Sequence, residues 1–259
     1  MKIALCFYGN VGTFYLNKVA YESDGDIDYR IGHRHWKNHV LDKNDVDVFI
    51  HSWSTQYKHG IINSYKPKKY LVEEQKAFDA VGSNKLGSLR KEVTASRWYS
   101  VMESIRLKKE YEEEKSIEYD LVISARLDWA WLVDIDFSIY TDTNLFYSPN
   151  NDNFMKKNPK LDDWLFFSNS KNMDDFSKLY QKFYVDNDKI SNPNTSINSH
   201  HDSYTFAKEC GLDVVLTENL RDGVEGMYVR ALYKNCKFST DYKFDKLELM
   251  HNGNNSKRF

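Results

Sequence analysis

This 259-residue chain has few cysteines, no long apolar run and no large excess of positive or negative charge. Its three cysteines are odd in number and stand at no ligand spacing, so we expect no disulfide framework. The formal net charge is only -2, which gives no basic field for nucleic acid or an anionic membrane. No stretch approaches the roughly 20 apolar residues that cross a bilayer, and the N-terminal apolar run is too short for a signal peptide. We expect a soluble, cytoplasmic protein with no transmembrane segment and no nucleic-acid partner.

Several well-known functional motifs are absent as well. The chain has neither the glycine pattern of a dinucleotide-binding fold nor that of a P-loop, and no G-x-S-x-G elbow of a serine hydrolase. His35 and His39 would share one face of a helix, yet no cysteine or carboxylate completes a zinc set with them. These absences exclude the commonest nucleotide-binding loops, and they favour a plain surface helix around the two histidines.

Aromatic residues, in contrast, are plentiful at 15% of the chain. Tyrosine and tryptophan stack on flat or ring-shaped ligands while they keep a polar edge, which suits a binding cleft. Ordinary core packing explains the same content equally well.

Short apolar runs alternate with amphipathic segments along the chain, and they predict strands and helices respectively. The predicted strands are 3–8, 46–50, 69–73, 119–125, 144–148, 164–168 and 213–217, and the predicted helices are 33–41, 88–114, 173–185 and 200–210. Such alternation predicts an α/β fold: a three-layer α/β/α, Rossmann-like domain with a mostly parallel central sheet. We see no linker or repeat, so we expect a single domain over 1–251 and a disordered tail over 252–259.

The apolar run over 119–125 ends abruptly on Arg126, and Asp128 follows after one further residue. An uninterrupted apolar run is typical of a strand that is buried on both faces of a parallel sheet. Ligands of open α/β sheets bind just beyond the carboxyl ends of such strands. Arg126 and Asp128, followed by Trp129 and Trp131, therefore predict a polar site with an aromatic wall.

Two further strand ends carry residues that suit ligand binding. Gly9 and Asn10 follow the first strand, where glycine lets the backbone approach a ligand, although a plain tight turn explains this glycine too. The second strand ends on His-Ser-Trp at 51–53. In a parallel sheet these two ends and Arg126 would lie at one edge.

The order of these segments resembles that of a known family. The segments are Asp-Val-Phe-Ile-His-Ser-Trp-Ser (47–54), Ser-Arg-Trp-Tyr-Ser (96–100), the run into Arg-Leu-Asp (119–128) and Asp-Asp-Trp-Leu-Phe-Phe (162–167). After an N-terminal strand that ends in glycine, they resemble the glycosyltransferases of large DNA viruses, phages and bacterial surface-polysaccharide loci, which in turn resemble GT-A-fold enzymes. The resemblance covers roughly residues 1–220. It implies a GT-A-like domain that moves a sugar from a nucleotide-sugar donor to a hydroxyl of a glycan or similar acceptor.

The resemblance also implies a metal site. GT-A enzymes bind a divalent cation through a DxD motif after a central strand, since a hard cation held by carboxylates neutralises the diphosphate leaving group. Here Arg126-Leu127-Asp128 stands in that place, with arginine at the first position. Either Arg126 binds a phosphate itself, or Asp128 holds Mn²⁺ or Mg²⁺, with His251 as a candidate further ligand. A simple ion pair between Arg126 and Asp128 is the structural alternative.

An acidic pair, Asp162-Asp163, precedes Trp164. An inverting sugar transfer needs a general base for the acceptor hydroxyl, and we assign that role to Asp163, with Asp162 and Trp164 beside the substrate. An exposed acidic loop is the alternative. His201 and Asp202 open a later helix and would face the acceptor, although Asp202 equally suits a helix cap.

The resulting hypothesis is a nucleotide-sugar-dependent glycosyltransferase in which Arg126, Asp128 and Asp163 are catalytic and the polar segment 187–199 closes over the donor. The residues expected to contact the donor are Tyr8, Gly9, Asn10, His51, Ser52, Trp53, Arg97 and Arg126. A sugar nucleotidyltransferase and a non-catalytic glycan-binding module are the alternatives. The sugar, the nucleotide, the acceptor, the stereochemistry, the metal dependence and the oligomeric state are left open.

Overall fold

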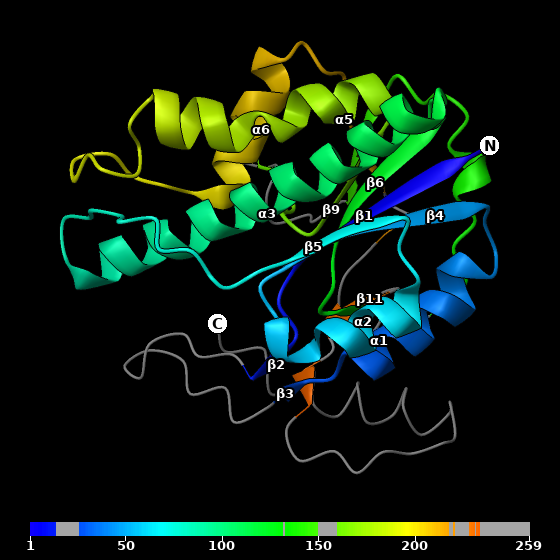
Figure 1. Ribbon diagram of the computed structural model, residues 1–259. Coiled ribbons are helices and arrows are strands. Elements are labelled where there is room, and N and C mark those ends of the chain that lie inside the picture. The colour runs from blue at the N-terminus through cyan, green and yellow to red at the C-terminus, as the bar shows by residue number, and fades with distance from the viewer. Residues whose placement is uncertain are drawn as a thin grey trace.

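The computed structural model describes residues 1–13, 26–131, 133–149, 160–217, 220, 228–230 and 232–233. Its centre is a seven-stranded sheet in the order β10-β8-β9-β6-β1-β4-β5. These strands are β1 (Ile3–Gly9), β4 (Val46–Ser52), β5 (Lys69–Val72), β6 (Leu121–Arg126), β8 (Phe146–Pro149), β9 (Leu165–Ser168) and β10 (Val214–Thr217). Helices cover both faces of the sheet (Figure 1), so the expected α/β, Rossmann-like arrangement with a mostly parallel sheet is confirmed.

Strand β9 is the exception to the parallel direction. It runs antiparallel to both of its neighbours, β6 and β8, whereas the other neighbouring pairs of this sheet are parallel. The first residue of β9, and not its last, therefore lies at the edge where the parallel strands end. Two small sheets add to the fold, and they contain β7 (Trp129–Trp131) with β11 (Tyr228–Arg230), and β2 (Gly12–Thr13), β3 (Asp26–Ile27) and β12 (Leu232–Tyr233).

The helices form one layer on each side of the sheet (Figure 1). The layer that faces β1 through Ala4, Cys6 and Tyr8 contains α3 (Lys85–Lys115), α5 (Ser170–Ser177) and α6 (Ser199–Glu209). The opposite layer contains α1 (Tyr29–Trp36) and α2 (Lys58–Tyr65). Shorter helical segments are the π-helical turns Lys37–Leu41 and Tyr180–Asp186 and the 3-10 turns Thr55–Tyr57 and Phe137–Ile139.

The predicted helices are present, with different ends. The helix predicted over 88–114 begins earlier because the Asn84 side chain caps it, accepting a hydrogen bond from the Gly87 N–H at 2.8 Å. The helix predicted over 173–185 is divided into α5 and the π-helical turn that follows. The helical period of the sequence does not distinguish an α-helix from a π-helical turn, so the division could not be predicted.

The core lies on both faces of the central strands. Leu5 and Phe7 of β1 pack against the α1 and α2 layer, while Cys6 and Tyr8 pack against α3. All four side chains are fully buried, as the apolar run predicts. Each such burial contributes roughly 1.5–3 kcal/mol for a large apolar side chain, so β1 and its neighbours form a rigid frame for whatever lies at their ends.

Two predictions concern regions outside this frame. Both His251 and the tail over 252–259 lie outside the described residues, and the single domain over 1–251 stays a prediction.

Within the described ranges, no helix combines the length and the apolar character that a bilayer crossing requires.

Candidate functional site

The carboxyl ends of β1, β4 and β6 lie side by side at one edge of the sheet. In the strand register Gly9 stands beside Ser52 of β4, and Tyr8 stands beside Arg126 of β6. Asp163 reaches the same edge because it precedes the antiparallel β9. The Tyr8 hydroxyl donates a hydrogen bond to the Asp163 backbone carbonyl at 2.6 Å, which ties the segment before β9 to the end of β1.

Arg126 and Asp128 form a bidentate ion pair at the end of β6. Nε and Nη2 of Arg126 donate to the two Asp128 carboxylate oxygens at 2.7 and 2.5 Å, and the side chains are 12% and 2% exposed. Burial works to lower the pKa of Arg126, but the Asp128 charge and hydrogen bonds outweigh it and raise that pKa. The guanidinium therefore stays charged, and its Nη1 makes no hydrogen bond to the residues that the structure describes.

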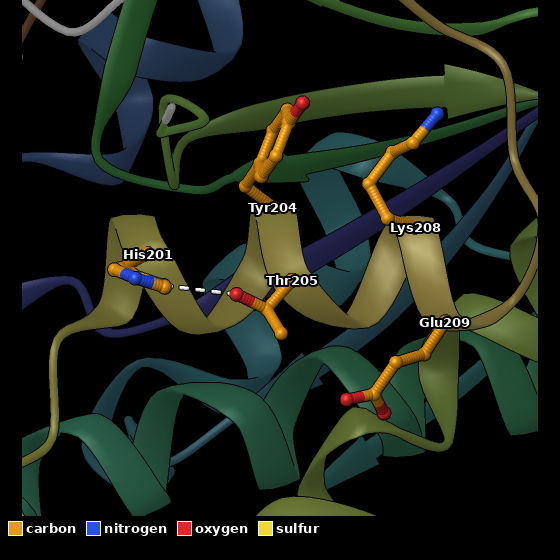
Figure 2. A pocket seen from close by; sticks show the side chains of 5 residues that line it. All are labelled: His201, Tyr204, Thr205, Lys208 and Glu209. Atoms are coloured by element: carbon orange, nitrogen blue, oxygen red, sulfur yellow. Dashed lines mark hydrogen bonds between the residues drawn. The ribbon is translucent and has the colours of Figure 1, made fainter. Parts of the chain in front are cut away.

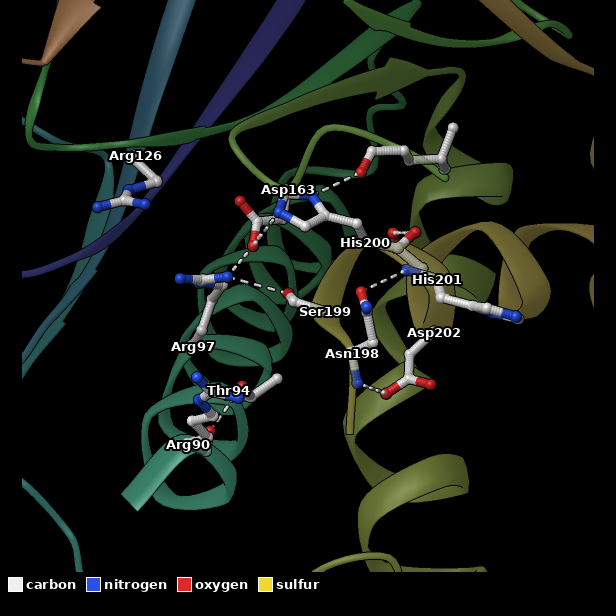
Figure 3. A network of polar contacts seen from close by, with 12 residues as sticks. Arg90, Thr94, Arg97, Arg126, Asp163, Asn198, Ser199, His200, His201 and Asp202 are labelled. Atoms are coloured by element: carbon white, nitrogen blue, oxygen red, sulfur yellow. Dashed lines mark hydrogen bonds and ion pairs between the residues drawn. The ribbon is translucent and has the colours of Figure 1, made fainter. Parts of the chain in front are cut away.

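Asp162, Asp163 and His200 form a second cluster beside this pair. One ligand atom from each lies within 4.8 Å of the others, and both carboxylates are buried. Asp163 Oδ2 pairs with Nη1 of Arg97 from α3 and lies 3.9 Å from His200 Nε2 (Figure 3). The same Arg97 nitrogen donates to Ser199 Oγ at 2.9 Å. The acidic pair is thus not an exposed loop but a buried junction of α3, α6 and the start of β9.

The orientation of the His200 ring follows from its backbone contact. Nδ1 lies 2.8 Å from the Leu161 carbonyl oxygen, and because a carbonyl can only accept, Nδ1 must carry the proton. Burial lowers the pKa of His200 to about 4, so the ring is neutral near pH 7. In that neutral tautomer Nε2 carries a lone pair, and this lone pair faces Asp163.

His51 lies inside the protein, between two partners that the sequence did not indicate. Its Nε2 is 3.2 Å from Glu73 Oε1, and its Nδ1 is 2.6 Å from Ser100 Oγ. Burial lowers the pKa of His51 in spite of Glu73, so the neutral ring donates from Nε2 and accepts at Nδ1 from the Ser100 hydroxyl. Ser100 Oγ also accepts from the Gly9 N–H at 3.1 Å. This chain of hydrogen bonds fixes the end of β1 to α3.

Ser52 and Trp53 also point inward. Ser52 Oγ accepts a hydrogen bond from the Ser54 N–H at 3.2 Å. The Trp53 ring stacks on Tyr99 of α3 with the ring centroids 5.5 Å apart. These contacts hold the strand end in place, and the expected donor contacts of His51, Ser52 and Trp53 stay predictions.

Gly9 and Asn10 leave room at the end of β1. Gly9 has φ +102°, and no described atom lies within 4 Å of the position that a Cβ would occupy. The Asn10 Oδ1 atom is buried and accepts no hydrogen bond from the described residues. A turn with open space and an unused acceptor suits the close approach of a ligand.

His201 and Asp202 point away from the cluster (Figure 3). His201 Nδ1 lies 2.9 Å from Thr205 Oγ1 on the outer face of α6. There it lines a shallow surface hollow together with Tyr204, Thr205, Lys208 and Glu209 (Figure 2). Asp202 is buried and accepts hydrogen bonds from the Tyr184 hydroxyl and the Lys189 ammonium at 2.9 Å each. Their predicted contact with an acceptor stays a prediction, and the histidine that reaches the cluster is His200.

The segment over 187–199 is anchored rather than loose. Lys91 of α3 is buried and donates to the carbonyls of Lys189 and Asn192 and to the Thr195 hydroxyl, at 2.8, 2.6 and 3.1 Å. A closing motion of this segment over a donor, as the sequence suggested, would have to break these bonds.

The expected aromatic wall lies in the core instead. Trp129 and Trp131 are both buried, and the Trp36 ring packs edge-on against Trp131 with the centroids 5.6 Å apart. Trp164 packs on Trp129 with the centroids 4.5 Å apart. The sequence does not show whether a tryptophan after a strand end faces solvent or the core. The burial of these rings places them in the core.

Among the described residues, the side chains that could share a metal ion are Asp162, Asp163 and His200, while metal binding by Asp128 stays a prediction. Both Asp128 oxygens accept hydrogen bonds from Arg126. Two carboxylates and one imidazole lone pair are, by contrast, a donor set that fits a divalent cation.

Comparison with known proteins assigns no family to the chain. No family model matches it, and no curated protein matches it in sequence.

Proposed function

We propose that the protein is a nucleotide-sugar-dependent glycosyltransferase. The observation that carries the proposal is the meeting of two arginines, Arg126 and Arg97, with two buried carboxylates, Asp162 and Asp163, at the carboxyl edge of the sheet. Guanidinium groups bind phosphate, and carboxylates accept hydrogen bonds from sugar hydroxyls. A donor with a diphosphate and a sugar carries both groups, at the edge where open α/β sheets bind ligands.

Arg126 is well placed to bind the diphosphate directly. Asp128 fixes the plane of the guanidinium through Nε and Nη2, while Nη1 has no hydrogen-bond partner among the described residues. A guanidinium that is already ordered loses little conformational entropy when it binds phosphate. This geometry supports the first of the two sequence alternatives, in which Arg126 itself binds phosphate.

In the proposed reaction the acceptor hydroxyl oxygen forms a bond to the anomeric carbon, and the bond from that carbon to the donor phosphate breaks. The diphosphate leaves with the electron pair of the broken bond, and the hydroxyl proton passes to a base or to the leaving group. Arg126 stabilises the charge that develops on the diphosphate. A divalent cation, when bound by Asp162, Asp163 and His200, supplies further charge stabilisation there. Asp163 as general base stays a prediction, because its pairing with Arg97 favours a binding role.

A thermal-shift screen of UDP, GDP, CMP and dTDP sugars, with and without Mn²⁺, tests the proposal. A donor at about 100 times its Kd should stabilise the folded protein by roughly 2.7 kcal/mol. Arg126→Lys, which loses the bidentate geometry, should lower the affinity for that donor at least about tenfold. The matched control is Arg106→Lys, because Arg106 pairs with Glu103 and Glu110 along α3.

The control should bind the donor as the wild type does. If no nucleotide or nucleotide sugar raises the melting temperature of the wild type, the proposal is wrong. Turnover of a nucleoside triphosphate with a sugar 1-phosphate, without sugar transfer to an acceptor, would instead indicate the nucleotidyltransferase alternative.

A further inference from the structure

We infer that Asp162, Asp163 and His200 bind one divalent cation of the Mn²⁺ type, separate from the Arg126–Asp128 pair. The inference rests on the proposed function only for the purpose of the cation, which is to hold the donor diphosphate. Its structural basis is the arrangement of the three side chains.

The distances between the donor atoms suit a shared ion. Two ligands that each lie about 2.1 Å from one ion are at most about 4.2 Å apart. The 3.9 Å between His200 Nε2 and Asp163 Oδ2 meets this condition. All three donor atoms lie within 4.8 Å of one another, which is close to this limit.

The orientation of His200 gives an independent argument. Its Nδ1–H donates to the Leu161 carbonyl, which is the usual outer contact of a histidine that binds metal through its other nitrogen. The Nε2 lone pair then faces the Asp163 carboxylate. A cation that replaced Arg97 beside Asp163 would be attracted both to this lone pair and to the carboxylate.

Arg97 gives the site a second property. Its guanidinium pairs with Asp163 and also contacts Ser199, so it occupies part of the position that a cation needs. A bound cation would displace Arg97 from Asp163 while the Ser199 contact remains. The guanidinium would then be available for a phosphate of the donor.

The choice of ion follows from the donor types. Imidazole nitrogen favours transition metals over Mg²⁺ and Ca²⁺, while carboxylates favour Mn²⁺ over softer ions. Three protein ligands leave further positions for phosphate oxygens and water. Mn²⁺ accepts all of these donors, so it is the ion to test first.

The test is a titration of the full chain with MnCl₂ alone, followed by electron paramagnetic resonance of the free ion. The wild type should bind one Mn²⁺ per chain, and His200→Ala and Asp162→Asn should each weaken binding at least about tenfold. His201→Ala is the matched control, because this neighbour points away from the cluster. It should bind as the wild type does, and so should Asp128→Asn. Arg97→Gln should bind Mn²⁺ more tightly, since a competing positive charge is removed.

Three results would overturn the inference: no stoichiometric binding by the wild type, unchanged binding by His200→Ala, or a loss that appears with Asp128→Asn alone. Circular dichroism checks the fold of each variant. If Asp162→Asn does not fold, His200→Ala decides, because a side chain that is 27% exposed tolerates truncation.

The two proposals fail in different ways. Absence of donor binding with Mn²⁺ binding intact contradicts the glycosyltransferase alone. Donor binding and turnover with no effect of His200→Ala on Mn²⁺ affinity contradict the cation site alone.

Discussion

Arg97 and Asp163 form an ion pair between the middle of α3 and the segment that precedes β9. The two residues are 66 positions apart in sequence, and their side chains are 22% and 3% exposed. The contact therefore joins two distant parts of the chain at the edge where β1, β4 and β6 end. Because the carboxylate is the more deeply buried partner, the pair stabilises the fold mainly by neutralising Asp163.

Loss of Arg97 should therefore destabilise the protein. We predict that Arg97→Met lowers the free energy of unfolding by about 2–3 kcal/mol, because it leaves a buried carboxylate without its main counter-charge. Urea unfolding in the presence of EDTA measures this. The control is Arg90→Met, at an exposed position of the same helix, which should change stability by less than about 0.5 kcal/mol. Equal losses in the two variants would contradict a stabilising ion pair.

Ser100→Ala should disturb the end of β1. It removes the hydroxyl that donates to His51 Nδ1 and accepts from the Gly9 N–H, so the buried His51 ring and the partly buried Gly9 N–H each lose a partner. The expected cost is about 1–3 kcal/mol, measured by urea unfolding. Ser96→Ala, one turn earlier on α3, is the control, since among the described residues the Ser96 hydroxyl bonds to the exposed Gln75 side chain alone. It should cost well under about 1 kcal/mol. If Ser100→Ala were equally mild, the hydrogen-bond chain would not hold this turn.

Gly9→Ala and Gly211→Ala separate backbone strain from ligand binding. Both glycines have positive φ, +102° and +72°, and neither has a described atom within 4 Å of the place where a Cβ would lie. Each substitution should therefore cost about 1–2 kcal/mol of backbone strain. Only Gly9→Ala should also lower the affinity for the donor, because its methyl group would occupy the open space at the end of β1. Calorimetric titration with the best nucleotide sugar measures the difference, and equal affinities would place the donor elsewhere.

How far the sequence predicts this protein depends on the kind of feature. The buried strands follow from continuous apolar runs, and the run before Arg126 is buried on both faces as expected. The direction of β9 cannot be predicted from the sequence. Antiparallel pairing depends on a strand distant in sequence, and the four residues of β9 contain no pattern that indicates it. The position of Asp163 at the same sheet edge as Arg126 depends on this direction, so the sequence alone does not establish it.

The candidate site shows the same division at finer scale. Sequence reasoning named His201, whereas His200 faces Asp163, since α6 begins at Ser199 and one residue turns a side chain by about 100°. The Asn198 cap, at the end of a polar segment, is the signal that would have fixed this register. The role of Ser100, which lies in the segment 96–100, could not be predicted, because the sequence does not show which groups a serine inside a long helix contacts.

Acid should destabilise the protein through His35. Burial lowers the pKa of His35 from 6.5 to about 4, against the effect of its hydrogen bond with the Trp131 carbonyl. Between these pH values the unfolded chain binds a proton that the folded protein does not, so stability is complete above about 6.5 and falls as the pH decreases to about 4. The loss is on the order of 3 kcal/mol.

Urea unfolding at several pH values between 4 and 7 measures this loss. His35→Asn keeps an N–H that can donate to the Trp131 carbonyl but does not titrate, so its stability should depend less on pH than that of the wild type. His59→Asn, at an exposed position, should keep the wild-type dependence. The same pH dependence in all three proteins would assign the effect to other groups.

Helix α3 holds three separate parts of the fold at once. Lys91 anchors the segment over 187–199, Arg97 pairs with Asp163, and Ser100 supports the Gly9 turn. Because these residues lie on one helix, the helix fixes the directions of their side chains relative to one another. A single residue inserted between Lys91 and Arg97 would turn the first contact by about 100° relative to the other two. The side chains can therefore be exchanged one at a time, whereas a change in helix length between them would misplace at least one of the three contacts.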